Sequence, residues 1–295
     1  MNQTDVVLYG ASGQLGLGLA ARLSALSWPY HIIPLPMGLV RDTAQLSPDI
    51  IPAVILNAAA YTDVAGAEQE PELAMAVNCD GVARLAELAK QHNALLVHFS
   101  TDYVFDGAGV RPWRELDKPA PLNVYGQSKL AGEQAILASG CRHLIIRTSW
   151  LHSPWRDNFL KTMLRVAQSR DELRVVCDQV GSPTSAMMLA EMTLLAIERV
   201  LGEPELGGLY HVAAFGAVSW FDYARFIFSE AYALGLIDKV PDLKPITSED
   251  YGGVVERPLN SRLDTQLFQQ TFGLLLPDWQ QGVKSTLHAL LQERQ

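Results

Sequence analysis

The chain has 295 residues, 48% of them hydrophobic, and its mean hydropathy of +0.08 allows a packed core in one or two domains. The formal net charge is −9, and the 23 Lys and Arg residues are scattered along the chain. Nucleic acids and anionic membranes bind concentrated basic surfaces, so this charge distribution argues against both as partners.

No apolar stretch approaches the roughly 18 residues of a membrane span, and residues 1–5 lack the basic segment that opens a signal peptide. We therefore expect a cytoplasmic protein. The three cysteines, Cys79, Cys141 and Cys177, are far apart and lack the spacing of a metal site. They predict reduced, buried thiols.

In chain order, four short apolar runs have the character of buried parallel strands. They are residues 6–9, 53–56, 95–99 and 144–146. Between the runs, apolar residues recur at helical spacing, as in Leu15, Leu19 and Leu23. This alternation predicts an α/β fold with a Rossmann-type doubly wound parallel sheet and helices on both of its faces.

After residue 150 the alternation loosens, and a stretch rich in Pro, Gly and aromatic residues runs from about 213 to 279. This stretch predicts a smaller C-terminal domain, while a helix near 185–200 and a strand near 209–213 return to the main sheet. The predicted main domain is therefore 1–149 plus about 184–214. The smaller domain is about 150–183 plus 215–295.

Segments rich in glycine or polar residues follow the four runs, at residues 10–16, 57–62, 100–106 and 147–150. Ligands of open α/β sheets bind at the carboxyl ends of the strands. We therefore expect these four segments to line one crevice.

The first segment, Gly-Ala-Ser-Gly-Gln-Leu-Gly from Gly10, has the glycine spacing of dinucleotide-binding loops. Glycines let the backbone approach a pyrophosphate, whose charge is met by free N–H groups and the positive end of the following helix. A plain tight turn is the alternative. We favour the cofactor site, which makes the main domain a dinucleotide-binding domain. Its predicted residues are Gly10, Ser12, Gly13, Gln14, Leu15 and Gly16.

The acidic residue that would hold the ribose of NAD is missing, because the second strand region reads Ile-Pro-Leu-Pro from Ile33. Its absence removes a charge that would repel a 2′-phosphate, and so it favours NADP. Arg41 would pair with that phosphate and Asp42 would reach the adenine, with solvated loop residues as the alternative for both. Small side chains after residue 57 would let the cofactor lie against the backbone, although tight helix–sheet packing explains them nearly as well. They are Ala58, Ala59 and Ala60.

Tyr125 and Lys129 are four residues apart and share one face if the stretch is helical. We expect the ammonium to lower the pKa of the Tyr125 phenol from about 10 towards working pH. Tyr125 would then protonate the alkoxide that forms when a hydride reaches a ketone, and Lys129 would bind the nicotinamide ribose. A hydroxyl of Ser100 or Thr101 would bind the substrate oxygen. A chance pair on a surface helix is the alternative.

Several segments together match one known family. They are the glycine loop from Gly10, Asn-Ala-Ala-Ala-Tyr-Thr from Asn57, Ser-Thr-Asp-Tyr-Val-Phe-Asp-Gly from Ser100, Tyr-Gly-Gln-Ser-Lys from Tyr125, Asp-Gln-Val-Gly-Ser-Pro-Thr from Asp178 and Arg-Pro-Leu-Asn-Ser-Arg from Arg257. With them the chain resembles the extended short-chain dehydrogenase/reductases called dTDP-4-dehydrorhamnose reductases, over nearly its whole length.

The resemblance implies that NADPH reduces the 4-keto group of dTDP-4-dehydro-L-rhamnose to give dTDP-L-rhamnose, and NADH stays open as the cofactor. It implies that the smaller domain binds the dTDP-sugar. The catalytic residues that it implies are Thr101, Tyr125 and Lys129. The substrate-binding residues are Thr101, Asp102, Tyr103, Trp150 and Arg257. Arg257 is the candidate for the diphosphate, because a planar fork of donors suits that group; a surface ion pair is its alternative.

The chain departs from the family at Gly18, where some members have an acidic residue that helps to hold a magnesium ion between two subunits. We therefore predict no metal, and a homodimer stays open.

Three other functions compete with this one. A sugar dehydratase is disfavoured, because Thr101 is followed by Asp-Tyr and not by Asp-Glu. A sibling 4-ketoreductase that gives another stereoisomer, such as dTDP-6-deoxytalose, stays open. So does a non-catalytic NADP-binding regulatory subunit, like that of methionine adenosyltransferase.

Overall fold

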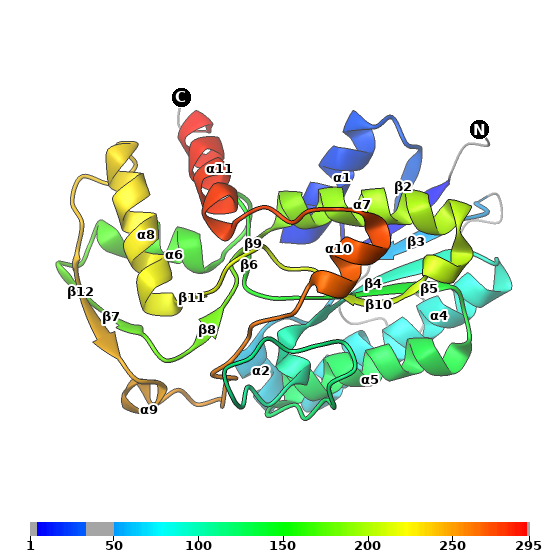
Figure 1. Ribbon diagram of the computed structural model, residues 1–295, viewed down its shortest axis with the longest axis horizontal. Helices are drawn as coiled ribbons and strands as arrows, with labels where there is room; N and C mark the ends of the chain where they lie inside the picture. The colour runs from blue at the N-terminus through cyan, green and yellow to red at the C-terminus, as the bar shows by residue number, and fades with distance from the viewer. Residues whose placement is uncertain (1–4, 34–49, 294–295) are drawn as a thin grey trace.

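The computed structural model describes residues 5–33 and 50–293, and its central feature is a six-stranded sheet (Figure 1). The strands are all parallel to their neighbours and lie in the order β2-β1-β3-β4-β5-β10. Their bounds are β1 (Val6–Tyr9), β2 (Tyr30–Ile33), β3 (Val54–Asn57), β4 (Leu95–Thr101), β5 (His143–Thr148) and β10 (Gly208–His211). The order reverses between β1 and β3, so the predicted doubly wound sheet is confirmed.

Helices cover both faces of this sheet (Figure 1). On one face lie α1 (Gln14–Ala25) and α7 (Ala186–Gly202), and on the other lie α4 (Gly81–Gln91) and α5 (Val124–Ser139). Successive side chains of a strand therefore pack against opposite layers of helices. In β1, Val6 and Leu8 belong to one buried cluster, and Val7 and Tyr9 belong to the other. A short series of helical turns connects β3 to α4. It consists of α2 (Val64–Gln69), α3 (Pro71–Met75) and a π-helix (Ala76–Asp80).

The rest of the chain forms a second group of elements beside the carboxyl ends of the strands (Figure 1). Its helices are α6 (Phe159–Ala167), α8 (Trp220–Ala233), α9 (Ser248–Tyr251) and α11 (Trp279–Gln292). The helix α10 (Gln266–Phe272) returns to the main sheet, where Phe268 and Phe272 pack against Tyr210 of β10. The short strands of the second group pair as β6 (Leu151–His152) with β9 (Thr184–Ser185), β7 (Glu172–Val176) with β12 (Asp242–Ile246), and β8 (Val180–Gly181) with β11 (Val218–Ser219). Two 3-10 turns, Asp102–Val104 and Pro204–Leu206, complete the elements.

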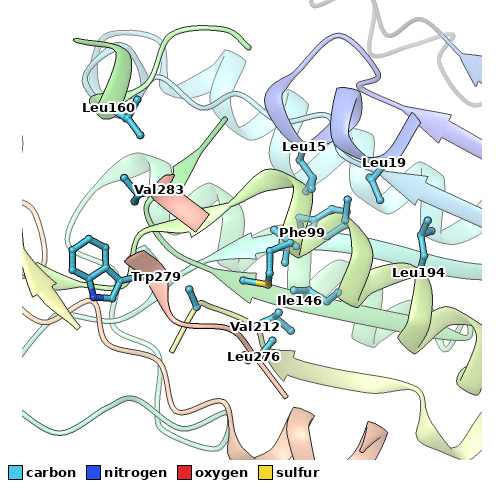
Figure 2. Close-up of a cluster of buried hydrophobic side chains, with 14 of the residues drawn as sticks. Leu15, Leu19, Phe99, Ile146, Leu160, Leu194, Val212, Leu276, Trp279 and Val283 are labelled. Atoms are coloured by element: carbon cyan, nitrogen blue, oxygen red, sulfur yellow. The ribbon is translucent and has the colours of Figure 1, made fainter. Parts of the chain in front are cut away.

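One buried apolar cluster extends from the sheet into the second group. Figure 2 shows Leu19 and Leu194 at one end of it and Leu160, Trp279 and Val283 at the other. The two predicted domains therefore share a core, and the boundaries between them stay a prediction.

The cysteines differ in their exposure. Cys141 is buried, as predicted, whereas Cys79 is half-buried and Cys177 is exposed, so the prediction of buried thiols is wrong for these two. Cys177 follows β7, which pairs only with β12 outside the main sheet, so less protein covers it. All three are free thiols. Within the described residues, no helix has both the length and the apolar character that a membrane span requires.

Candidate active site

The glycine loop after β1 is a tight turn pressed against the segment that follows β3. Gly10 has a φ of +76°, and a Cβ there would lie 2.4 Å from the Ala59 backbone nitrogen. A Cβ on Gly16 would lie 2.0 Å from the Gly10 carbonyl oxygen. No side chain caps the helix that begins at Gln14, so the N–H groups of its first turn are left for an anion.

This loop opens into a cavity of about 970 Å³ at the carboxyl ends of β1, β3, β4 and β5. The segments after these strands meet there, as predicted. The predicted residues that line it are Gly10, Ser12, Gly13, Gln14, Leu15, Ala58, Ala59, Ala60, Thr101, Asp102, Tyr103, Tyr125, Lys129, Trp150 and Arg257. Gly16 is not among the lining residues, because it packs behind the turn. Arg41 and Asp42 lie outside the described residues.

The cavity brings Thr101, Tyr125 and Lys129 together. Thr101 ends β4, and its hydroxyl donates to Asp102 Oδ1 at 3.1 Å while lying close enough to the Tyr125 phenol to lower its pKa. Tyr125 and Lys129 lie on consecutive turns of α5, whose first turn is capped by Asn123 through a 2.8 Å hydrogen bond from the Gly126 N–H. The amide of Asn123 also donates to the Glu256 carbonyl oxygen at 3.0 Å, which holds the neighbouring Arg257 near this end of the helix.

Burial has the largest effect on the pKa values of Tyr125 and Lys129. It raises the pKa of Tyr125, the nearby Thr101 hydroxyl opposes this increase, and the charge of Asp102 adds to it. Burial lowers the pKa of Lys129 to about 8, against the opposing effect of Glu133. The prediction that Lys129 brings the Tyr125 pKa down is therefore wrong, because desolvation of the phenol outweighs any attraction to the ammonium.

Lys129 is held from behind by β4. Its Nζ donates to the Phe99 carbonyl oxygen at 2.7 Å and lies 3.4 Å from His98 Nε2. Asn57 Oδ1 accepts from the Ala59 N–H at 3.2 Å, so the Asn57 amide nitrogen faces His98 Nδ1 at 3.0 Å. Burial lowers the pKa of His98 well below its usual value, so this imidazole is neutral. The sequence placed Asn57 in the crevice but gave its side chain no role, and it missed His98, although a histidine inside an apolar strand is a signal that could have revealed it.

Buried polar atoms without partners gather on the cavity wall. Among the described residues, Ser100 Oγ, Thr148 Oγ1 and Asp102 Oδ2 accept or donate no hydrogen bond. Burial raises the pKa of Asp102 to about 6, and the neighbouring hydroxyls of Ser261 and Thr101 oppose this increase. Unpaired buried polar atoms are unfavourable, so their position here fits a polar ligand that completes the site.

The far wall of the cavity is aromatic. Trp150 has a φ of +48° and stacks on Trp220 with 3.5 Å between ring centroids. Tyr103 meets Tyr125 edge to face at 5.7 Å, and Arg257 is exposed but close enough to lower the pKa of Tyr103. Trp220 is a further residue that sequence reasoning missed, because it lies 70 positions from Trp150. These side chains present flat apolar surfaces beside the reactive groups.

A buried ion pair fixes α5 to the sheet. Arg147 on β5 bonds both oxygens of Glu133, at 2.8 and 2.6 Å, and both residues are almost fully buried. Its guanidinium also lies over the Phe105 ring, 5.1 Å from the centroid. The helix that carries Tyr125 therefore has little freedom to shift along the strands.

The prediction that no metal is bound depends on Gly18, which lies in α1 and is packed against another helix of the chain. A Cβ at Gly18 would lie 3.0 Å from the Ala186 carbonyl oxygen of α7. In the part of the chain that the structure describes, no three His, Cys, Asp or Glu side chains are grouped so that they could hold a metal ion.

Known proteins resemble this chain over its whole length. The chain is 43% identical to the dTDP-4-dehydrorhamnose reductase of Escherichia coli strain K12, with 97% of this chain and 98% of the relative covered. It is 37% identical to the reductase of the same name from Burkholderia thailandensis, with 98% and 99% covered.

Solved structures agree. The dTDP-4-dehydrorhamnose reductase from Bacillus anthracis, crystallised in complex with NADP, superposes with a TM-score of 0.86 at 35% identity, with 97% of this chain and 99% of that chain covered. A UDP-glucose 4-epimerase from Thermotoga maritima, at 17% identity and a TM-score of 0.74, shares the fold alone. The model of the RmlD substrate binding domain family matches residues 4–292. The resemblance drawn from the motifs is thus confirmed, and the chain belongs to the RmlD substrate-binding domain family of dTDP-4-dehydrorhamnose reductases.

Proposed function

We propose that this protein reduces the 4-keto group of dTDP-4-dehydro-L-rhamnose with NADPH and releases dTDP-L-rhamnose. The observation that carries the proposal is the meeting of Thr101, Tyr125 and Lys129 in a cavity that begins at a phosphate-binding loop. The relatives that bear the name dTDP-4-dehydrorhamnose reductase support it, because they match almost the full chain.

The cavity fits a dinucleotide. The loop of Gly10, Ser12 and Gly13 and the uncapped end of α1 would hold the pyrophosphate. Ala58, Ala59 and Ala60 would lie along the cofactor, and Lys129 would donate to the nicotinamide ribose. A bound NADPH supplies the hydride. NADP in the Bacillus anthracis relative supports this cofactor over NADH, and Arg41 and Asp42 stay predictions for its 2′-phosphate and adenine.

The raised pKa of Tyr125 suits an acid. A phenol that stays protonated at neutral pH can give its proton to the strongly basic alkoxide that a reduced ketone becomes. Thr101 would hold the substrate oxygen beside that phenol, since both side chains line the same cavity and the hydroxyl is near enough to affect the pKa of the phenol. Lys129 is 2% exposed, and its protonated ammonium would place a positive charge behind Tyr125.

The sugar end of the site would be built from Asp102, Tyr103 and Trp150, with Arg257 for the diphosphate. The unpaired oxygen of Asp102 is free to accept a sugar hydroxyl. We further propose that the second group of elements, about 150–183 plus 215–295, is the substrate-binding domain, because it supplies Trp150 and Arg257. The homodimer and the cytoplasmic location stay predictions.

The test is incubation with the dTDP-keto sugar and each reduced cofactor, with loss of absorbance at 340 nm and the product identified by NMR. We expect rapid oxidation of NADPH and a rhamnose product. A talose product would favour the sibling reductase. Tight NADPH binding without any oxidation would favour the regulatory subunit and refute the proposal.

A further inference from the structure

Arg156 lies in the turn before α6, and its side chain crosses to the phosphate loop. Its Nε donates to the Ser12 carbonyl oxygen at 2.7 Å, although the two residues are 144 positions apart. Arg156 also lines the large cavity, together with Ser12, Gly13 and Gln14. The guanidinium therefore borders the end of the cavity that the glycine loop forms.

The turn is fastened to the loop at a second point. Ser153 Oγ and Asn158 Nδ2 both donate to Gln14 Oε1, at 2.8 and 3.0 Å. Asn158 also donates to the Ser153 carbonyl oxygen at 2.8 Å and caps α6 by accepting from the Lys161 N–H at 3.1 Å. Arg156 thus projects from a braced turn whose position relative to the loop is fixed.

The backbone of Arg156 is in an uncommon conformation. Its φ is +55°, in the left-handed region where L side chains are crowded and glycine is favoured. Residues in uncommon backbone conformations of this kind cluster at active sites and ligand-binding sites. At this position the side chain is the one that contacts the phosphate loop.

The charge of Arg156 is not neutralised by a neighbour. The adjacent carboxylate, Asp157, pairs with Arg165 at 3.4 Å. Within residues 5–33 and 50–293, no carboxylate lies at ion-pair distance from Arg156, and its two terminal nitrogens make no hydrogen bond. A guanidinium with free N–H groups is suited to two oxygens of a phosphate, and it offsets locally the net charge of −9.

We propose that Arg156 binds the pyrophosphate of the dinucleotide cofactor and so completes, from residues 153–158, the phosphate site that the start of α1 begins. The proposal rests on the proposed function only in taking a dinucleotide as the ligand. It adds a contact from the second group of elements to a cofactor otherwise held by the sheet.

The experiment compares cofactor affinity in Arg156→Gln and in Arg170→Gln. Arg170 is an exposed arginine after α6, so its variant has the same change of charge away from the cavity. Titration of NADPH and NADH, followed by fluorescence, gives the dissociation constants. We expect Arg156→Gln to weaken both cofactors by about 10- to 100-fold, because both carry a pyrophosphate, and Arg170→Gln to change neither. Unchanged affinity would overturn the proposal. Loss for NADPH alone would overturn it too, since the contact would then be with the 2′-phosphate.

Arg156→Gly separates binding from folding. Glycine adopts the left-handed conformation without strain, so this variant is expected to melt at the same or a higher temperature while its affinity falls as in Arg156→Gln. Wild-type affinity in the glycine variant would refute the proposal. Neither titration needs the sugar. Absence of turnover in the wild-type protein would therefore refute the proposed function alone. The role of Arg156 would still be decided by the dissociation constants of NADPH and NADH.

Discussion

Lys129 is expected to destabilise the fold in which it works. Its side chain is 2% exposed, and burial lowers its pKa from 10.5 to about 8. A shift of this size corresponds to about 3 kcal/mol by which the folded state disfavours the ammonium. We therefore expect Lys129→Met, which removes the charge and keeps an unbranched apolar side chain, to make the protein more stable at pH 7.

The net gain is smaller than the charge alone suggests. Methionine cannot donate to the Phe99 carbonyl oxygen, which Lys129 Nζ reaches at 2.7 Å, and an unpaired buried acceptor costs about 1 to 2 kcal/mol. We expect Lys129→Met to raise the free energy of unfolding by about 1 to 2 kcal/mol at pH 7. The same variant should lose turnover and bind NADPH more weakly, because the predicted ribose contact is removed.

The pH dependence distinguishes this explanation from a packing effect. The folded-state pKa of Lys129 lies below its unfolded value, so the penalty is fully present below about pH 8 and disappears as the pH rises to about 10.5. Urea denaturation of both proteins between pH 7 and pH 10.5 should show the advantage of Lys129→Met shrinking over that interval and then reversing.

Lys90→Met is the matched control. Lys90 Nζ also donates to a backbone oxygen, that of Ser139 at 2.7 Å, but its side chain is exposed. Its substitution should change stability little at any pH. A Lys129→Met protein that is less stable than the wild type at pH 7, or whose difference from the wild type stays constant with pH, would refute the reasoning.

Three further substitutions test other parts of the site. Tyr125→Phe should lower kcat by about 100- to 10,000-fold in the absorbance assay and leave the NADPH dissociation constant unchanged; equal activity would remove the phenol from the mechanism. Glu133→Gln should cost about 3 to 5 kcal/mol in urea denaturation, because it leaves a buried guanidinium unpaired. Gly16→Ala should abolish NADPH binding, since the new Cβ would lie 2.0 Å from the Gly10 carbonyl oxygen, whereas Gly202→Ala, which meets nothing within 4 Å, should bind normally.

Local pattern predicts the four central strands β1, β3, β4 and β5 well, because they are almost fully buried on both faces and appear in the sequence as apolar runs. It does not predict the edge strand β2 in this way, since its side chains are exposed or half-buried. The run at 95–99 predicts β4, yet the strand continues to Thr101, since Ser100 and Thr101 pair with Arg147 and Thr148 of β5. Polar residues at the end of a buried strand break the apolar run without ending the hydrogen-bonded ladder. The end of the strand that carries Thr101, the proposed catalytic residue, is thus the part that hydrophobicity does not reveal.

Contacts between distant segments explain what the sequence could not show. The His98 contact with Lys129 joins residues 31 apart, and the Arg156 contact with Ser12 joins residues 144 apart. Neither has a spacing that a single sequence reveals. The direction of the pKa shift of Tyr125 could not be predicted for a related reason. The spacing between Tyr125 and Lys129 is visible in the sequence, whereas the burial that raises the pKa of the phenol is a property of the assembled cavity.

The apolar cluster that joins the sheet to α6, α8 and α11 has a consequence for how the molecule comes apart. Detaching either group of elements would expose to water the side chains that the other group covers, so neither can melt alone without a large penalty. The two groups should therefore lose their structure in one cooperative step. Ligand exchange would then proceed through small local openings at the rim of the site and not through wide separation of two halves.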